Sequence, residues 1–129
     1  MQVFEKSSYS GWGNRLNIID ENNVFVGFDF ESGCCENFGY VFTDKKPVSE
    51  VDFSDQKSVE FKHEDFVFDP EYFEKLTGSW LYEGGAVSFR LINKQGAEIF
   101  LVLYNCHNGY YKHGFEMKVG DSTKYDDSL

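Results

Sequence analysis

Three apolar runs joined by turn residues near the C-terminus constrain the fold of this chain more than any other feature. Gly96 stands where a tight turn requires a positive φ, and Asn108-Gly109 is the pair favoured in type I′ turns. Short apolar runs between turns of this kind predict consecutive antiparallel strands, a meander. The predicted strands are residues 86–92, 97–105 and 110–119.

A second group of strands is expected in the N-terminal half. Residues 24–30 alternate between apolar and other side chains with a period of two, which indicates a strand with one buried face. Residues 15–19 are also β-rich, and the Asx residues in 20–23 suit a tight turn, so the two runs predict a hairpin. Residues 2–5 predict a short strand. Residues 38–42 alternate as a strand does, although a short helix beginning near Cys35 is the alternative.

One helix is expected, over residues 69–77. Asp69 suits the N-cap position and Pro70 the first helical position. Gly78 is a plausible stop signal at the C-terminal end. The apolar stripe of this helix would be formed by Tyr72, Phe73 and Leu76.

The predicted fold class is therefore α+β, dominated by an antiparallel sheet that combines the hairpin, the C-terminal three-stranded meander and one short helix. The length of 129 residues fits a single domain, and the 14 Phe, 8 Tyr and 2 Trp supply enough apolar bulk for a core. Residues 120–129 are polar, which predicts a loose C-terminal tail.

The net charge of −10 limits the classes of partner. It argues against binding to a nucleic-acid backbone, which needs a basic face, and against anionic membrane surfaces.

No run approaches the ~18 apolar residues that a membrane span needs, and the N-terminus has no signal-peptide pattern. The three cysteines are an odd number, and two of them are adjacent, which is a poor disulfide framework. We therefore expect a cytoplasmic protein.

Much of the negative charge falls within residues 50–74, where nine acidic residues stand against two lysines. Such a surface favours a basic protein partner, because complementary charge speeds association and selects partners. Small acidic inhibitors of nucleases, whether immunity proteins or phage anti-defence proteins, have this character. The alternative is a solvated face that keeps the protein soluble. Within the same segment Val59, Phe61 and His63 alternate with charged residues and predict a strand. The candidate partner-binding residues are Glu50, Asp52, Asp55, Glu60, Glu64, Asp65 and Glu71.

A second candidate site combines cysteine, histidine and tyrosine from two separate motifs. Its thiols and imidazoles could ligate zinc, a thiol could act as a nucleophile beside a histidine base, or the tyrosines could line a pocket for a small ligand such as a nucleotide. Adjacent cysteines on a strand point to opposite faces, and neither a CxxC nor an HxxxH pair is present. We therefore assign no metal, no cofactor and no catalytic residue. The ligand-binding candidates are Cys34, Cys35, Cys106, His107, Asn108, Tyr110, Tyr111 and His113.

If these residues form one site, the two motifs should lie at the same end of the sheet. Cys34 or Cys35 would then come close to His107, Tyr110 or His113, because a rigid sheet positions the loop residues at its ends. The competing explanation is that each motif is only a well-made turn, with buried thiols filling the core.

The same motifs carry a resemblance. Gly33-Cys34-Cys35-Glu36, followed by Asn105-Cys106-His107-Asn108-Gly109-Tyr110-Tyr111-Lys112-His113-Gly114-Phe115, resembles a family of small bacterial and phage-associated proteins that is a domain of unknown function. In that family a Cys-Cys element precedes an Asn-Gly-Tyr-Tyr turn. The resemblance implies a bacterial or phage origin and a single small domain. It implies no catalytic residue and no substrate.

The sequence thus predicts a non-enzymatic interaction protein, an acidic inhibitor or immunity-type protein that binds a basic protein. The alternative is a small-ligand or metal-binding protein that uses the Cys/His/Tyr residues. Oligomeric state is left open by the sequence.

No disulfide is expected between Cys34 and Cys35, because a reducing compartment keeps thiols free. Titration of the denatured protein, purified without reductant, should therefore count all three thiols of the chain. A count below three would contradict this expectation.

Overall fold

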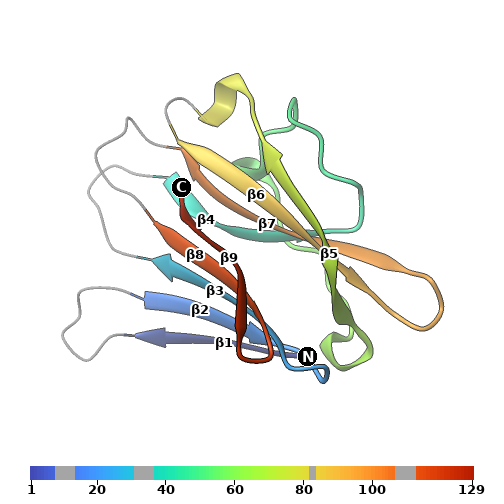
Figure 1. Ribbon diagram of the computed structural model, residues 1–129. Helices are drawn as coiled ribbons and strands as arrows, with labels where there is room; N and C mark the ends of the chain where they lie inside the picture. The colour runs from blue at the N-terminus through green and yellow to red at the C-terminus, as the bar shows by residue number, and fades with distance from the viewer. Residues whose placement is uncertain (8–13, 31–36, 82–83, 107–112) are drawn as a thin grey trace.

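The protein is an assembly of two antiparallel β-sheets packed face to face, as the computed structural model shows for residues 1–7, 14–30, 37–81, 84–106 and 113–129 (Figure 1). The five-stranded sheet has the order β1-β2-β3-β8-β9 and the four-stranded sheet the order β4-β7-β6-β5. The strands of the first sheet are β1 (Gln2–Ser7), β2 (Asn14–Ile19), β3 (Val24–Phe30), β8 (Gly114–Val119) and β9 (Ser122–Ser128). Those of the second are β4 (Asn37–Thr43), β5 (Val67–Leu76), β6 (Gly85–Ile92) and β7 (Glu98–Cys106).

The described residues contain no α-helix. Their helical structure consists of three single 3₁₀ turns, η1 (Phe53–Asp55), η2 (His63–Asp65) and η3 (Ser79–Leu81). In this part of the chain, no helix is long and apolar enough to span a membrane.

A continuous apolar core lies between the two sheets. Alternate residues of each inner strand point into it, as the period of two requires. From the five-stranded sheet, Leu16, Ile18 and Phe28 are fully buried, and Phe89 and Leu101 meet them from the four-stranded sheet. Each such side chain contributes about 1.5–3 kcal/mol through burial. The alternating sequence therefore stabilises the packing of one sheet on the other.

A smaller core covers the outer face of the four-stranded sheet. Val41 and Val102 point to this face and pack with Phe53 of η1 and Leu81 of η3. The indole N–H of Trp80 donates to the carbonyl of Ser49 at 2.9 Å, which fastens η3 to the 44–58 segment. The irregular segment that carries much of the acidic charge is thus anchored on this sheet.

The predicted helix over residues 69–77 is wrong, and with it the α+β class, because this stretch belongs to β5, an edge strand. The carboxylate of Asp69 does accept a hydrogen bond from the N–H of Glu71 at 3.0 Å, but this bond forms within a β-bulge. The register of the β5–β6 pairing shifts between Asp69 and Phe73. Pro70 lies within this shift, where its lack of a backbone N–H breaks no hydrogen bond of the sheet. Phe68 and Phe73 both reach the core as a result.

The predicted C-terminal meander is wrong in its pairing, although strands occur in all three predicted stretches; of the strand predicted at 110–119, residues 114–119 form β8 and 110–112 lie outside the described residues. Residues 86–92 and 97–105 correspond to β6 and β7, which pair as predicted. However, β8 pairs with β3 and β9 in the other sheet, while β7 pairs with β4. The chain therefore crosses from one sheet to the other between Cys106 and Gly114, so β7 and β8 do not form a hairpin. The proposed Asn108-Gly109 turn lies outside the described residues.

Two further expectations are corrected. The tail expected at 120–129 contains β9, whose Tyr125 ring stacks on Phe73 of β5 with centroids 4.1 Å apart. Polar sequence suits this strand because it is an edge whose side chains are mostly exposed. The strand predicted around Val59 and Phe61 is also wrong, since 58–62 is irregular and η2 follows it.

The other local predictions are confirmed. The strands at 2–5 and 38–42 correspond to β1 and β4. The hairpin of 15–19 and 24–30 corresponds to β2 and β3. The turn at 93–96 has Gly96 at φ 87°.

Asp20, in the β2–β3 turn, ties the two sheets together. It is 6% exposed. One carboxylate oxygen accepts from the N–H groups of Asn22 and Val24, both at 2.9 Å. The other accepts from the N–H of Phe68 in β5 at 2.8 Å. A buried backbone donor left without a partner is costly, so this carboxylate holds both the turn and the sheet-to-sheet contact.

Replacing Asp20 should destabilise the protein strongly. Asp20→Ala leaves three N–H groups without their acceptor, and we expect a loss of about 2–4 kcal/mol in the free energy of unfolding. Asp20→Asn should also destabilise, because its amide NH₂ would face a backbone donor. Glu21→Ala, at the exposed neighbour, is the matched control and should change stability by less than about 0.5 kcal/mol. Urea denaturation measures all three, and equal midpoints for Asp20→Ala and Glu21→Ala would contradict the role of Asp20.

Candidate functional site

Six of the predicted partner-binding carboxylates lie on one irregular segment, residues 50–65, which we call the acidic segment. It includes η1 and η2 and contributes two exposed lysines, Lys57 and Lys62. The seventh carboxylate lies on β5. All seven are exposed: Glu50, Asp52, Asp55, Glu60, Glu64, Asp65 and Glu71.

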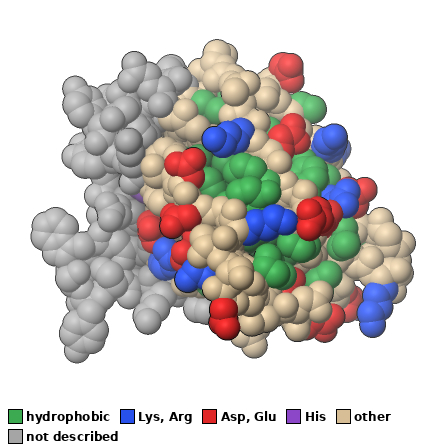
Figure 2. Space-filling view, in the orientation of Figure 1, with side chains coloured by type: hydrophobic (Ala, Val, Ile, Leu, Met, Phe, Trp, Pro, Cys, Tyr) green, Lys and Arg blue, Asp and Glu red, His purple; other side chains and the backbone are tan. Residues whose placement is uncertain are grey.

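The carboxylates of the acidic segment form no ion pair with a Lys or Arg among the described residues. On the face formed by β5 and β9, by contrast, acidic and basic side chains are interleaved (Figure 2). There Glu71 pairs with Lys124 at 3.4 Å and Asp127 with Lys75 at 3.9 Å. With six carboxylates against two lysines, the acidic segment therefore presents net negative charge, and none of its carboxylates is held in an ion pair by the described part of the chain.

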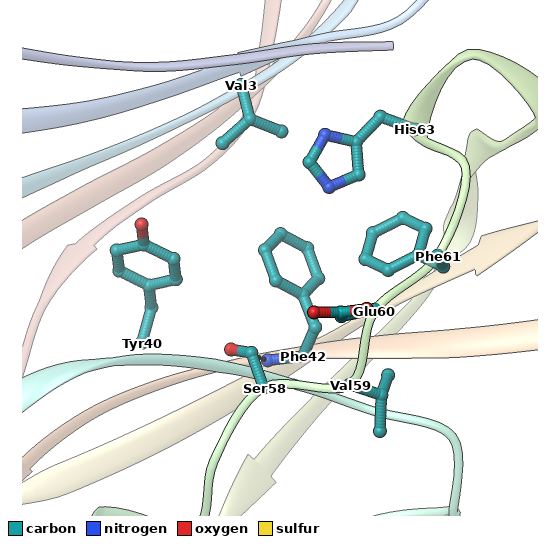
Figure 3. Close-up of a pocket in the computed structure, with 8 residues that line it drawn as sticks. All are labelled: Val3, Tyr40, Phe42, Ser58, Val59, Glu60, Phe61 and His63. Atoms are coloured by element: carbon teal, nitrogen blue, oxygen red, sulfur yellow. Dashed lines mark hydrogen bonds between the residues drawn. The ribbon is translucent and has the colours of Figure 1, made fainter.

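A cavity lies beside the acidic segment, between the edge strands β1 and β4. Its volume is about 510 Å³, within the ~300–1,000 Å³ typical of ligand sites, and it is open to solvent. Figure 3 shows side chains from β1, from β4 and from the acidic segment around this space, which we call the aromatic cavity. The described residues that line it are Val3, Tyr40, Phe42, Ser58, Val59, Glu60, Phe61 and His63.

The position of this cavity follows from the sheet edges. On one side of the two layers, β9 and β5 are closed against each other by the Tyr125–Phe73 stack and by ion pairs. On the other side, β4 is partly covered by the acidic segment: the N–H of Val59 donates to the carbonyl of Phe42, and the N–H of Phe42 to the hydroxyl of Ser58, both at 3.0 Å. The aromatic cavity lies in the space left toward β1.

The rings in the cavity are held by one another. Phe61 packs against Phe42 with centroids 5.0 Å apart and against His63 at 4.5 Å. Tyr40 meets Phe42 edge-on at 6.0 Å, and Phe66 supports Phe61 from the core at 5.3 Å. The rings are thus tilted relative to one another and fix one another's orientation in the wall of the cavity.

Most of the predicted Cys/His/Tyr site lies outside the described residues, namely Cys34, Cys35, His107, Asn108, Tyr110 and Tyr111. The strands that flank the two motifs are neighbours, because Asn37 at the start of β4 is the register partner of Cys106 at the end of β7. The distances from Cys34 or Cys35 to the histidines stay a prediction. Among the described residues, no group of three or more His, Cys, Asp or Glu could hold a metal ion.

His113 is described and fully buried. Its ring stacks on Phe38 with centroids 4.1 Å apart, and Nδ1 lies 3.0 Å from the carbonyl oxygen of Asp29. Its backbone exchanges two hydrogen bonds with Leu129. These contacts place His113 in the core where β3, β4 and β8 meet, away from solvent.

Cys106 is a buried free thiol. Burial raises its pKa to about 11, and the nearby Asp52 carboxylate adds to the rise, whereas a hydrogen bond with Ser54 opposes it. A nucleophilic cysteine requires the opposite shift of its pKa. Cys106 packs in the smaller core on the outer face of the four-stranded sheet, and the direction of its pKa shift disfavours a nucleophilic role.

Sequence reasoning missed most of the aromatic cavity. It singled out Glu60 for its charge, but it did not connect the rings of Tyr40 and Phe42 with those of Phe61 and His63. The sequence pattern at these positions was the alternation in 38–42 and 59–63. This pattern indicated two strands, each with one buried face, and it did not indicate that the two stretches share a space.

Comparison of the chain with protein-family models, with curated proteins and with solved structures gave no match.

The raised pKa of Cys106 has a measurable consequence. A shift from 9.0 to about 11 lowers the thiolate fraction near pH 8 by about 100-fold. We therefore expect alkylation of Cys106 by iodoacetamide, followed by peptide mass spectrometry, to be at least about 100-fold slower in the native protein than in denaturant. Native alkylation at the denatured rate would show that the thiol is exposed or activated.

Proposed function

We propose that this protein is a non-enzymatic binding protein whose partner is a basic protein that docks on the acidic segment. The observation that carries the proposal is the set of six exposed carboxylates on residues 50–65, without a cationic partner among the described residues. Unneutralised charge of this density attracts and orients an oppositely charged surface.

The acidic segment is also preorganised. The Asp52 carboxylate accepts from the N–H of Ser54 at 2.9 Å and caps η1, while Phe53 is buried beneath it. Charges held on an ordered backbone lose less conformational entropy on binding than charges on a free loop. A standard interface takes ~800 Å² from each partner, which is about a tenth of the 7711 Å² surface of this chain.

A basic nuclease is the kind of partner that this surface fits. Such an enzyme carries a cationic groove for the phosphate backbone, and an acidic protein that occupies the groove excludes the substrate. This supports an inhibitor or immunity-type role for the chain.

Small-ligand binding is the second candidate function, and the aromatic cavity favours it. The ligand would contact Tyr40, Phe42, Phe61 and Glu60, and not the Cys/His/Tyr residues proposed from the sequence.

Charge reversal within the acidic segment tests the proposed function. The triple variant Glu50→Lys, Asp55→Lys, Glu64→Lys spares the η1 cap and the aromatic cavity. Its binding to a panel of purified basic ribonucleases and deoxyribonucleases, measured by fluorescence anisotropy, should be at least about 10-fold weaker than that of the unaltered protein. Raising the salt from about 50 to about 500 mM should also weaken binding, because the Debye length shortens.

The matched control reverses three other exposed carboxylates, those of Glu21, Asp121 and Asp126. Its net charge equals that of the test variant, so only the location of the charge differs. Equal loss of binding in both variants would mean that net charge alone acts. Absence of binding to every panel member at low salt would contradict the proposal.

A further inference from the structure

The aromatic cavity combines the two groups that recognise an organic cation. The partly exposed rings of Phe61 and Tyr40 line the cavity together with the buried ring of Phe42, and Glu60 supplies an exposed carboxylate. A cation that lies over an aromatic face is attracted by the ring quadrupole, and a carboxylate beside it accepts its N–H groups. None of the described lining residues is a Lys or Arg, and the nitrogen base among them is His63.

The combination of an aromatic ring and carboxylates also surrounds two arginines of the chain itself. The guanidinium of Arg15 pairs with Asp29 and Glu116 and lies 5.9 Å from the ring centroid of Phe25. Gly27 leaves room for it, because a Cβ there would collide with the guanidinium.

Arg90 repeats the arrangement on the other sheet. Its guanidinium pairs with Asp69 and with Glu98, the latter at 3.5 Å, and lies 5.6 Å from the ring centroid of Tyr72. Within this fold, a ring next to carboxylates therefore holds a guanidinium in two separate places.

We propose that the aromatic cavity binds one arginine side chain of the basic partner, with the guanidinium over the Phe61 ring and its N–H groups donated to Glu60. This inference rests on the proposed function, which it deepens by naming the group that enters the cavity (Figure 3). Val3 and Val59 provide apolar surface for the methylene stem.

Arginine fits better than lysine for two physical reasons. Its guanidinium is planar and stacks on ring faces, and it is less strongly hydrated than an ammonium group, so it loses less on entering an apolar space. Glu64 and Asp65, both exposed in η2 next to His63, add negative potential near the cavity. A nucleotide base would also stack on the rings, but these carboxylates would repel its phosphates.

The direct test uses small probes that do not require a known partner. N-butylguanidinium, N-butylammonium and the neutral isostere N-butylurea are titrated into the protein, and the aromatic and methyl resonances are followed by NMR. Saturable shifts confined to Val3, Tyr40, Phe42, Phe61 and His63 are expected with butylguanidinium, weaker ones with butylammonium and none with butylurea. Equal shifts with butylurea, or no shifts with butylguanidinium, would overturn the proposal.

Two variants locate the interaction. Glu60→Gln keeps the shape of the side chain and removes its charge, and Phe61→Leu removes a ring face; each should weaken butylguanidinium binding by about fivefold or more. Asp126→Asn is the matched control, since it removes one exposed carboxylate charge on β9, at the opposite edge of the five-stranded sheet from β1, and it should weaken binding by less than about twofold. Unchanged resonances elsewhere in the spectrum establish that each variant is folded. Loss of binding in Asp126→Asn equal to that in Glu60→Gln would overturn the assigned contact.

The same variants separate this inference from the proposed function. If a nuclease of the panel binds, Phe61→Leu should reduce its affinity about fivefold, while the charge of the acidic segment is unchanged. Normal nuclease binding by Phe61→Leu would overturn insertion of an arginine and leave the proposed function standing. If no nuclease binds, the proposed function fails, and the butylguanidinium titration still decides whether the cavity binds a guanidinium.

Discussion

Burial of the inner faces of the two sheets is the interaction on which the rest of this structure depends. The fully buried Phe28 and Phe89 come from opposite sheets, and neither sheet could keep its apolar face in water alone. Asp20 adds a polar connection, because its carboxylate in the β2–β3 turn accepts from the backbone of β5. With the layers fixed in this way, the positions of the four sheet edges are fixed as well.

The edges then determine where binding is possible. The edge strands β9 and β5 pack against each other through the Tyr125–Phe73 stack, while a cavity separates the edge strands β1 and β4. An irregular segment lies along β4 and contributes both the exposed carboxylates and the Phe61 ring. The acidic surface and the aromatic cavity are therefore parts of one region of the protein. This proximity gives a physical basis for a single partner that uses its charge for attraction and one cationic side chain for specificity.

The chain also shows how polar and aromatic groups share a sheet surface. Arg15 and Arg90 each lie on an outer face, where carboxylates and one ring enclose the guanidinium. The buried thiol of Cys106 shows the opposite situation, in which an apolar environment suppresses ionisation. Whether a polar side chain can bind a partner therefore depends on its place in the two-sheet structure, at an exposed face or edge or in a buried core, more than on its residue type.

Local sequence determined the strands wherever the apolar period of two was clear, as in 24–30 and 86–92, and it determined the turn at Gly96. It also indicated an acidic surface within residues 50–74, because charged side chains are costly to bury. Tertiary structure alone decided three matters. It made β5 a bulged edge strand, because Phe68 and Phe73 gain more from the core than Asp69 and Pro70 gain from beginning a helix. It placed β8 in the sheet opposite β7, since alternation states that a strand has a buried face but not which strand it pairs with. It brought Tyr40 and Phe42 to Phe61 and His63, because the space between two sheet edges is a property of the packed layers and is not encoded in any one segment.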